Sequence, residues 1–350
     1  MTEGTRHERP EHTSPRRLVI PRVGSPSVLR VEPYEPASPG PGQVRVRVHY
    51  AGINFADLMM RLGLYRPKPK MPFTPGYELS GAVESLGSGV DDLEIGQPIV
   101  AVVPSGAQQT HLCVDRHQVI ALPEDISLER AAAIPVTYLT AWHMLVHLGA
   151  LRKGETVLIH GIAGGVGTAA VQIAKLFEAG AIYGTASSSK AEQVMKMRAK
   201  MLPKSGFGAD LLRQTDGRGA DHILDPIGGA HLRESYDALA PGGKLYSFGL
   251  SSAAPSAFFN PFAALKALWS MRGFSMSQMM IDNRAVLGVH MGTFADQELL
   301  RGHLAKILES VSQGKLSPIV DSVFHLEDAQ AAHQHIHDRR NFGKVLLDLR

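Results

Sequence analysis

The sequence predicts an α/β protein of two domains, one rich in β-strands and one built around a doubly wound parallel sheet. The length of 350 residues suits two domains, and a hydrophobic fraction of 44% can fill two cores. The first third of the chain shows short strand patterns separated by glycine and proline. A strand, a glycine-rich turn and a helix then follow over residues 156–175, as in a βαβ unit.

The β-rich domain is predicted from period-two patterns. Residues 44–50 alternate between inward apolar and outward polar positions, which is typical of a half-buried strand, and residues 39–42 mark the turn before it. Three further short strands are expected at 79–86, 99–103 and 110–114. From residue 128 the pattern becomes helical, with helices expected over 129–133 and 139–148.

The glycine turn after the strand at 157–159 predicts a dinucleotide site. Its glycines let a ligand approach the backbone closely, and the following helix presents its positive end to a pyrophosphate. The spacing is G-x-x-G-x-x-G, because Ile162 stands where the usual fingerprint has glycine. The alternative is a structural turn with no ligand. The turn residues expected at the cofactor are Gly161, Ala163, Gly164, Gly165, Val166 and Gly167.

The second strand of this unit, at 181–185, indicates which dinucleotide binds. An NAD site usually has an acidic residue near the end of this strand, whereas residues 185–190 contain hydroxyls and a lysine. Ser187 and Lys190 therefore favour the 2′-phosphate of NADPH, since an anion needs donors and positive charge. The alternative is that Ser187 and its neighbours only cap the next helix.

The remaining elements complete the parallel sheet and return to the first domain. Strands are expected at 222–224, 244–248, 286–290 and 344–348, and a helix at 297–313. Residues 255–281 are rich in methionine and aromatics, which predicts a core helix, with a substrate lid as the alternative.

Composition excludes several classes of protein. The net charge of +3 is mild and no basic stripe is interleaved with aromatics, so no nucleic-acid partner is expected. The single cysteine, Cys113, excludes an internal disulfide and suits a reducing compartment, which predicts a cytoplasmic protein. No apolar run is long enough to span a bilayer. Residues 1–16 are predicted to be a disordered tail.

Several motifs together resemble the medium-chain dehydrogenase/reductase superfamily. These are the glycine turn and residues 51–57, 75–81 and 225–229. The resemblance is to the zinc-free quinone oxidoreductase branch, and residues 184–190, 283–292 and 341–347 are closest to vesicle amine transport protein homologues. It implies a GroES-like catalytic domain over 17–134 and 288–350, a Rossmann domain over 135–287, and a cofactor cleft between them.

The resemblance also bears on metals. Zinc-dependent members hold catalytic zinc with a cysteine and a histidine, and here Asn54 and Tyr77 occupy those positions. Zinc needs several nitrogen or sulfur ligands, so no metal site is expected. The histidines near the C-terminus, His333, His335 and His337, are interpreted as surface residues.

Without zinc, the predicted activity is hydride transfer from NADPH to an acceptor that conjugation has already activated, such as a quinone or an enone. Tyr65 matches a tyrosine that related enoyl-thioester reductases use as a proposed proton donor; a pocket wall is the alternative. Asn54 is expected to hold a carbonyl or ribose group, or only to brace its loop. Asp57 is expected to cap a helix over 58–62.

The resemblance implies further contacts and partners. The cofactor contacts are Thr140, Phe248, Gly249, His290, Met291, Asn341 and Lys344. The usual tyrosine at the 2′-phosphate is missing from residues 200–206, so Lys204 is a further candidate. A homodimer is expected through the apolar strand 286–290. Two alternatives remain, an enoyl-thioester reductase of a biosynthetic pathway and a non-catalytic NADPH-binding protein that associates with membranes or lipids.

Overall fold

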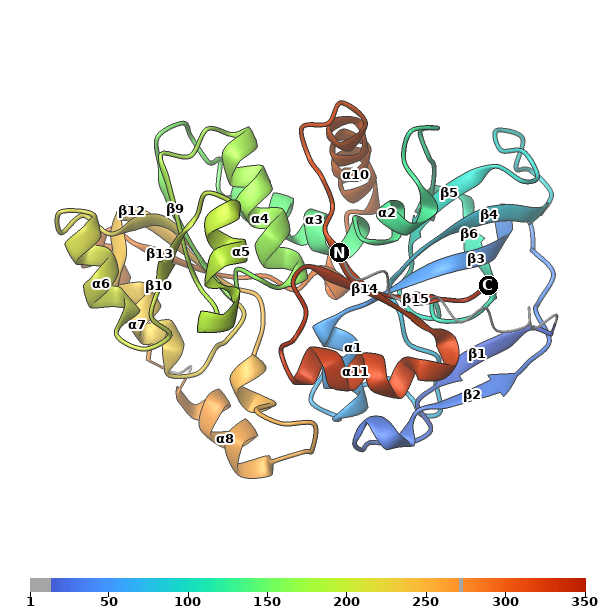
Figure 1. Ribbon diagram of the computed structural model, residues 1–350, viewed down its shortest axis with the longest axis horizontal. Helices are drawn as coiled ribbons and strands as arrows, with labels where there is room; N and C mark the ends of the chain where they lie inside the picture. Colours follow the sequence, from blue (N-terminus) through green and yellow to red (C-terminus); the bar gives the residue numbers. More distant parts are fainter. Residues whose placement is uncertain (1–13, 271–272) are drawn as a thin grey trace.

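The computed structural model describes residues 14–270 and 273–350 and shows two sheets side by side (Figure 1). Residues 1–13 of the predicted tail lie outside the described part, and strand β1 begins at Arg16. The mixed sheet lies on the right in Figure 1 and the parallel sheet on the left, with helices α3 and α10 between them. This arrangement confirms the predicted α/β class.

The mixed sheet has seven strands, in the order β14-β15-β3-β4-β5-β7, with β6 paired to β3. Its strands are β3 (Gln43–Ile53), β4 (Glu78–Leu86), β5 (Pro98–Val102), β6 (His111–Asp115), β7 (Val119–Ala121), β14 (Val320–His325) and β15 (Lys344–Asp348). A separate hairpin pairs β1 (Arg16–Val19) with β2 (Arg30–Pro33). The antiparallel pairing of β15 with β3 sets Val345 opposite Ile53, so the C-terminal strand lies beside the segment that leads into the first helix.

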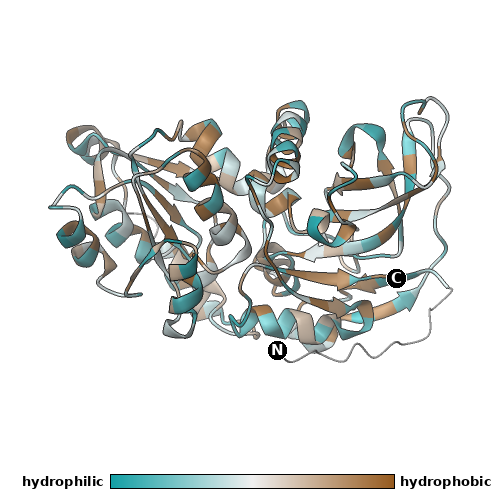
Figure 2. Cartoon of the chain, turned by 45° about the horizontal axis from the view of Figure 1, so that its top comes forward, coloured by the Kyte–Doolittle hydropathy of each residue, from teal (hydrophilic) through white to brown (hydrophobic). Residues whose placement is uncertain are grey.

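The parallel sheet has six strands in the order β10-β9-β8-β11-β12-β13. Its strands are β8 (Thr156–His160), β9 (Ala181–Thr185), β10 (Lys200–Leu202), β11 (Ala220–Asp225), β12 (Leu239–Ser247) and β13 (Ala285–Gly288). Every residue of β8 and β11 is buried, as expected for central parallel strands covered on both faces. Figure 2 shows these strands as brown ribbons inside the domain. The predicted strand at 181–185 is confirmed to the residue.

Helices cover the parallel sheet and fill the space between the sheets. The covering helices are α4 (Gly165–Leu176), α5 (Ala191–Lys196), α6 (Phe207–Gln214) and α7 (His231–Asp237). The others are α1 (Phe55–Arg61), α2 (Leu128–Ala132), α3 (Pro135–Trp142), α8 (Pro261–Ser270), α9 (Met276–Asp282), α10 (Gln297–Ser312) and α11 (Ala329–His337). Residues His143–Leu148 continue α3 as π-helix. None of the described helices is long and apolar enough to cross a bilayer.

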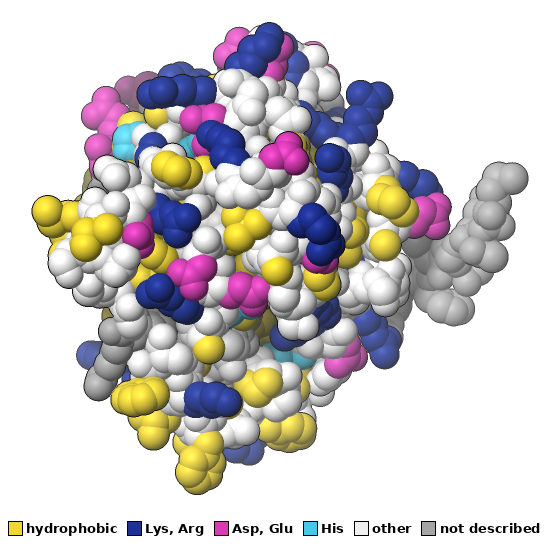
Figure 3. Space-filling view, turned by 90° about the vertical axis from the view of Figure 1, so that its left-hand side faces the viewer, with side chains coloured by type: hydrophobic (Ala, Val, Ile, Leu, Met, Phe, Trp, Pro, Cys, Tyr) yellow, Lys and Arg dark blue, Asp and Glu magenta, His cyan; other side chains and the backbone are white. Residues whose placement is uncertain are grey.

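The structure corrects the prediction of a core helix over residues 255–281. Residues 271–272 lie outside the described part, but α8 and α9 on either side turn their larger apolar side chains outward. The exposed apolar residues of this segment are Phe258, Phe259, Phe262, Leu265, Leu268, Trp269, Met276, Met280 and Ile281. The buried positions of α8 are Ala264 and Ala267, which pack on the short helical turn Ser251–Ala253, so composition alone pointed the wrong way. Figure 3 shows apolar side chains gathered at the foot of this end of the molecule.

Candidate functional site

The glycine turn lies where the parallel sheet faces the second domain. Gly161, at φ +65°, turns the chain out of β8, and Gly164 precedes the twelve-residue helix α4. A Cβ at Gly167 would lie 2.5 Å from the Gly161 carbonyl oxygen, so only glycine lets the helix pack this closely on the turn. The unblocked first-turn N–H groups of α4 form a cradle that suits a pyrophosphate.

The turn also contacts the C-terminal segment of the chain. The Gly343 N–H donates to the Ala163 carbonyl at 2.9 Å, and Gly164 pairs with Gly343 as an isolated bridge. A Cβ at Gly165 would lie 2.8 Å from Thr137 Cγ2. The glycines of the turn therefore also allow the two domains to approach each other.

The end of β9 brings Ser187, Lys190 and Asn341 together. Lys190 is 9% exposed, and its ammonium donates to the Asn341 carbonyl. Burial lowers the pKa of Lys190, the Asp321 carboxylate raises it, and the positive charge of Lys204 lowers it. Lys204 therefore lies close enough to act on the charge of Lys190. Ser187 stands at the N-cap position of the short helical turn Ser188–Lys190, but its hydroxyl contacts that of Ser189 at 3.1 Å and makes no cap hydrogen bond.

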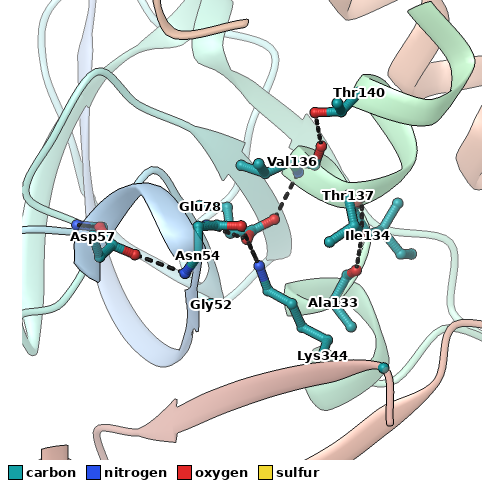
Figure 4. Close-up of polar contacts among 12 residues, drawn as sticks. Gly52, Asn54, Asp57, Glu78, Ala133, Ile134, Val136, Thr137, Thr140 and Lys344 are labelled. Atoms are coloured by element: carbon teal, nitrogen blue, oxygen red, sulfur yellow. Dashed lines mark hydrogen bonds and ion pairs between the residues drawn. The ribbon is translucent and has the colours of Figure 1, made fainter. Parts of the chain in front are cut away.

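A buried network joins the side chains of Asn54, Glu78 and Lys344 (Figure 4). The Lys344 ammonium forms an ion pair with Glu78 and donates to Asn54 Oδ1 at 2.6 Å. Asn54 Nδ2 donates to Glu78 Oε1 at 2.9 Å, and the other oxygen of Glu78 accepts from the Val136 N–H at 2.7 Å. A Cβ at Gly52 would overlap both Glu78 and Lys344. The network therefore ties β3, β4 and β15 to the first turn of α3.

The network bears on the roles that were expected for Asn54 and Lys344. Both polar groups of the Asn54 amide are used by Glu78 and Lys344, as in the alternative of a bracing amide. Lys344 uses two of its three protons in the network, and its aliphatic stem lies beside Gly165 of the cofactor turn. Glu78 was not among the residues predicted for the site, although its place in the Gly76-Tyr77-Glu78 motif was a signal for a role.

Asp57 differs from its predicted place. Helix α1 begins at Phe55 and not at residue 58, and Asn54 occupies the N-cap position. Asp57 is the third helical residue and accepts from the Asn54 N–H at 2.7 Å and from the Gly76 N–H at 3.1 Å. Burial raises the pKa of Asp57 to about 7, and the two backbone N–H groups oppose the rise. The residue fixes the loop that carries Tyr77.

Tyr65, which follows α1, lies against rings from the segment before β4 and from the segment after β13. Its ring centroid is 6.3 Å from that of Tyr77 and 5.2 Å from that of His290. A Cβ at Gly292 would lie 2.7 Å from the Tyr65 hydroxyl oxygen. Burial raises the pKa of Tyr65, and hydrogen bonding with Tyr77 opposes that rise. The structure thus groups Tyr65, Tyr77 and His290, which the sequence had presented as separate motifs.

The other expected cofactor contacts lie in α3, directly after β12 and in the segment after β13. Thr140 is inside α3 and donates to the Val136 carbonyl at 2.6 Å, so it is not an N-cap. The Phe248 N–H donates to the Asp225 carbonyl, and a Cβ at Gly249 would lie 2.7 Å from the Pro226 carbonyl oxygen. Met291 begins the short helical turn Met291–Thr293 and packs at the edge of the main core.

One group of potential metal ligands occurs among the described residues, namely His160, Asp225 and His231. Most of its polar atoms already have partners, and the exception is the buried His231 Nε2. His160 lies within hydrogen-bonding distance of Thr185 and Ser235, and Asp225 accepts from the Ile227 and Gly228 N–H groups and contacts His231 at 2.7 Å. The group therefore braces the loop after β11.

The C-terminal histidines are not simple surface residues. His333 is fully buried, which lowers its pKa well below the usual value, and His335 lies 2.8 Å from Asp321. His337 Nε2 lies 2.6 Å from the buried guanidinium of Arg61. Helix α11 packs over β14 and β15, where His335 and His337 contact Asp321 and Arg61, whereas both ring nitrogens of buried His333 lack a hydrogen-bond partner. Alternation in sequence did not reveal these positions.

Comparisons with known proteins agree with this architecture. Residues 40–126 match a family model described as alcohol dehydrogenase GroES-like domain, and residues 190–347 match one described as zinc-binding dehydrogenase. The human synaptic vesicle membrane protein VAT-1 homolog is 36% identical over 323 residues, which cover 91% of this chain and 82% of that protein.

Two solved structures show the same fold over nearly the whole chain. Escherichia coli quinone oxidoreductase, complexed with NADPH, superimposes with a TM-score of 0.84 at 28% identity, covering 95% of this chain and 99% of that one. CurK enoyl reductase superimposes with a TM-score of 0.80 at 26% identity, covering 96% and 99%.

A GroES-like domain and a Rossmann domain that meet at a glycine turn define a nicotinamide-dependent oxidoreductase fold. The chain belongs to the medium-chain dehydrogenase/reductase superfamily. Within it, the chain is similar to VAT-1 homologues and to quinone oxidoreductases, as the motifs predicted.

Proposed function

We propose that the protein is an NADPH-dependent, zinc-independent reductase of quinones or activated enones. The observation that carries the proposal is the glycine turn at the carboxyl end of β8, whose Gly165 lies beside the stem of Lys344, which in turn donates to Asn54. NADPH, when bound, would supply a hydride. The chain supplies orientation and polar donors.

The residues at the turn suit NADPH. The first-turn N–H groups of α4 would receive the pyrophosphate, and Ser187 with Lys190 would receive the 2′-phosphate. Lys204 adds positive charge in the absence of the usual tyrosine. The other contacts proposed for the cofactor are Thr140, Phe248, Gly249, His290, Met291 and Asn341.

Zinc independence follows from the residues at the metal positions. Asn54 has both amide groups in the buried network, and Tyr77 is a phenol, so neither offers a free nitrogen or sulfur ligand. The acceptor must then be activated by its own conjugation. In this proposal Tyr65 protonates the reduced acceptor or holds its oxygen.

The proposal is tested by following NADPH oxidation against a panel of quinones, cyclic enones and enoyl thioesters, with NADH in parallel. We expect turnover with quinones or enones. Turnover restricted to enoyl thioesters would instead favour an acyl-chain reductase, which the similarity to CurK enoyl reductase keeps as a second candidate. Cofactor binding without turnover on any acceptor would refute a reductase.

We also propose a homodimer in the cytoplasm. Strand β13 forms one edge of the parallel sheet and pairs only with β12 among the described strands, so its outer backbone groups are available to a second copy. Exposed Met276, Met280 and Ile281 lie on α9, directly before this strand. A reducing compartment suits the free thiol of Cys113.

A further inference from the structure

The peptide group between Asn341 and Phe342 lies between a cation beside the parallel sheet and an anion in the mixed sheet. Its carbonyl accepts from the Lys190 ammonium, and its N–H donates to Asp321 Oδ1 at 2.6 Å. The C=O and the N–H of a trans peptide point in opposite directions, so the two charged groups lie at opposite edges of one peptide plane. Lys190 ends the helical turn after β9, whereas Asp321 belongs to β14.

We propose that Asp321 is a positioning residue for Lys190, and that through this peptide group it holds the ammonium where the 2′-phosphate of NADPH binds. The proposal rests on the proposed function and deepens it, because it makes a residue of the mixed sheet a determinant of the choice between NADPH and NADH. Lys190 would contact the phosphate, and Asp321 would act through Lys190 without touching the cofactor.

The Asp321 carboxylate is fixed by contacts on both of its oxygens. Oδ1 accepts from the Phe342 N–H, while Oδ2 lies 2.8 Å from His335 Nε2 and accepts from the Ser322 hydroxyl at 2.8 Å. The Asp321 side chain is only 16% exposed, so little water competes for these contacts. The carboxylate therefore keeps the peptide group in one orientation.

The backbone that carries the peptide group has little freedom to move. The Gly343 N–H donates to the Ala163 carbonyl of the glycine turn, and the Lys344 N–H donates to the Ile319 carbonyl, both at 2.9 Å. Gly343 has φ +101°, and a Cβ there would lie 2.5 Å from the Ile319 carbonyl oxygen, so only glycine fits. The Asn341 carbonyl is thus presented to Lys190 from a fixed position beside the turn.

This arrangement keeps the charge of Lys190 available to an anion. An ammonium has three donors, and the Asn341 carbonyl takes one of them, which leaves two for a phosphate. A carboxylate in direct contact with Lys190 would repel the phosphate, whereas the intervening peptide group keeps Asp321 about 7 Å from the ammonium. Burial lowers the pKa of Lys190 and the Asp321 carboxylate opposes that change, as expected for charges that interact across one peptide group.

The test measures the dissociation constants of NADPH and NADH by fluorescence titration, which needs no turnover. Asp321→Ala should weaken NADPH binding about fivefold and leave NADH binding within about twofold, because only the phosphate depends on Lys190. Asp321→Asn, whose amide oxygen can still accept from the Phe342 N–H, should keep the preference for NADPH or increase it. Asp237→Ala, which removes an exposed carboxylate paired with Arg233 on α7, is the control.

Three results of this titration would overturn the positioning role. They are an equal loss of affinity for both cofactors in Asp321→Ala, no loss for either, and a loss in Asp321→Asn as large as that in Asp321→Ala. The first would leave Asp321 with a purely structural role. The last would show that the acceptor for the Phe342 N–H is not what matters.

A double-mutant cycle separates the positioning role from a general effect on the fold. In a Lys190→Ala background, Asp321→Ala should change the ratio of the two dissociation constants by less than about twofold, since the residue through which Asp321 acts is gone. A fivefold effect that persists in that background would show that Asp321 acts on the cofactor by another route, and would overturn the proposal.

Hydrogen exchange at the Phe342 amide tests the contact independently of cofactor preference. The amide should exchange slowly in the wild type and in Asp321→Asn, and much faster in Asp321→Ala. Saturating NADPH should leave it slow, because the phosphate uses the two other protons of Lys190. If the wild type binds both cofactors equally, the NADPH assignment of the proposed function fails. A Phe342 amide that exchanges fast in the wild type, or that NADPH releases, would overturn the role of Asp321 whatever the cofactor preference.

Discussion

Glu78 and Lys344 form an ion pair from which water is excluded on both sides, although 266 residues separate them in the sequence. Their side chains are 0% and 4% exposed. Glu78 also accepts from Asn54 and from the first turn of α3, so the pair has the extra hydrogen bonds that a buried charge needs. It joins β15, the last strand of the chain, to the first turn of α3.

Lys344→Met should destabilise the protein strongly, because it leaves the Glu78 carboxylate buried without its cation. We expect the free energy of unfolding to fall by about 3 kcal/mol or more. The double variant Glu78→Gln/Lys344→Met should recover much of the loss, since a neutral amide can still bond Asn54. Urea denaturation measures both, with Lys306→Met on the exposed face of α10 as control. A single variant within about 0.5 kcal/mol of wild type would contradict this account.

Lys190→Ala should narrow the preference for NADPH over NADH. The ammonium of Lys190 is the proposed partner of the 2′-phosphate, and a hydrogen bond to a charged group is worth about 1.5–3 kcal/mol. The ratio of the two dissociation constants should therefore fall about tenfold or more. Fluorescence titration measures it, and Lys196→Ala, which removes a surface lysine paired with Glu192, is the control. Equal affinity of the wild type for both cofactors would contradict the assignment.

Purified protein should contain no stoichiometric zinc, and a chelator should leave its reductase activity intact. Asn54 and Tyr77 stand at the metal positions, and the chain has a single cysteine. Atomic emission measures the metal content after dialysis. A result near one zinc per chain, with activity lost on chelation, would show that a ligand set other than the family's exists.

In solution the protein should have twice the chain mass of 37.8 kDa. Light scattering at micromolar concentration checks the mass. Hydrogen exchange locates the contact, because the outward amides of β13 should be protected at high concentration and exchange faster on dilution. A mass of one chain throughout would refute the dimer, and protection confined to another segment would place the interface elsewhere.

Local patterns in the sequence determined much of the fold. The alternation at residues 44–50 and the glycine turn depend on neighbours within a few residues, and both elements are found where they were expected. Ser187 and Lys190, which we propose as donors to the cofactor phosphate, were also recognisable in the sequence as a short motif. Such features are readable because their physical cause, burial on one face or close backbone approach, acts locally.

Only the tertiary structure decided which of these residues meet. The contacts of Glu78 with Lys344, of Lys190 with Asn341 and of Tyr65 with His290 join segments that are distant in sequence. Helix α8 also shows what the sequence could not decide. Its apolar composition predicted burial, but the helix packs through two alanines and leaves its large side chains exposed. The type of a residue determines which groups it can bind. Its surroundings in the folded protein decide whether water, a partner chain or another side chain reaches it.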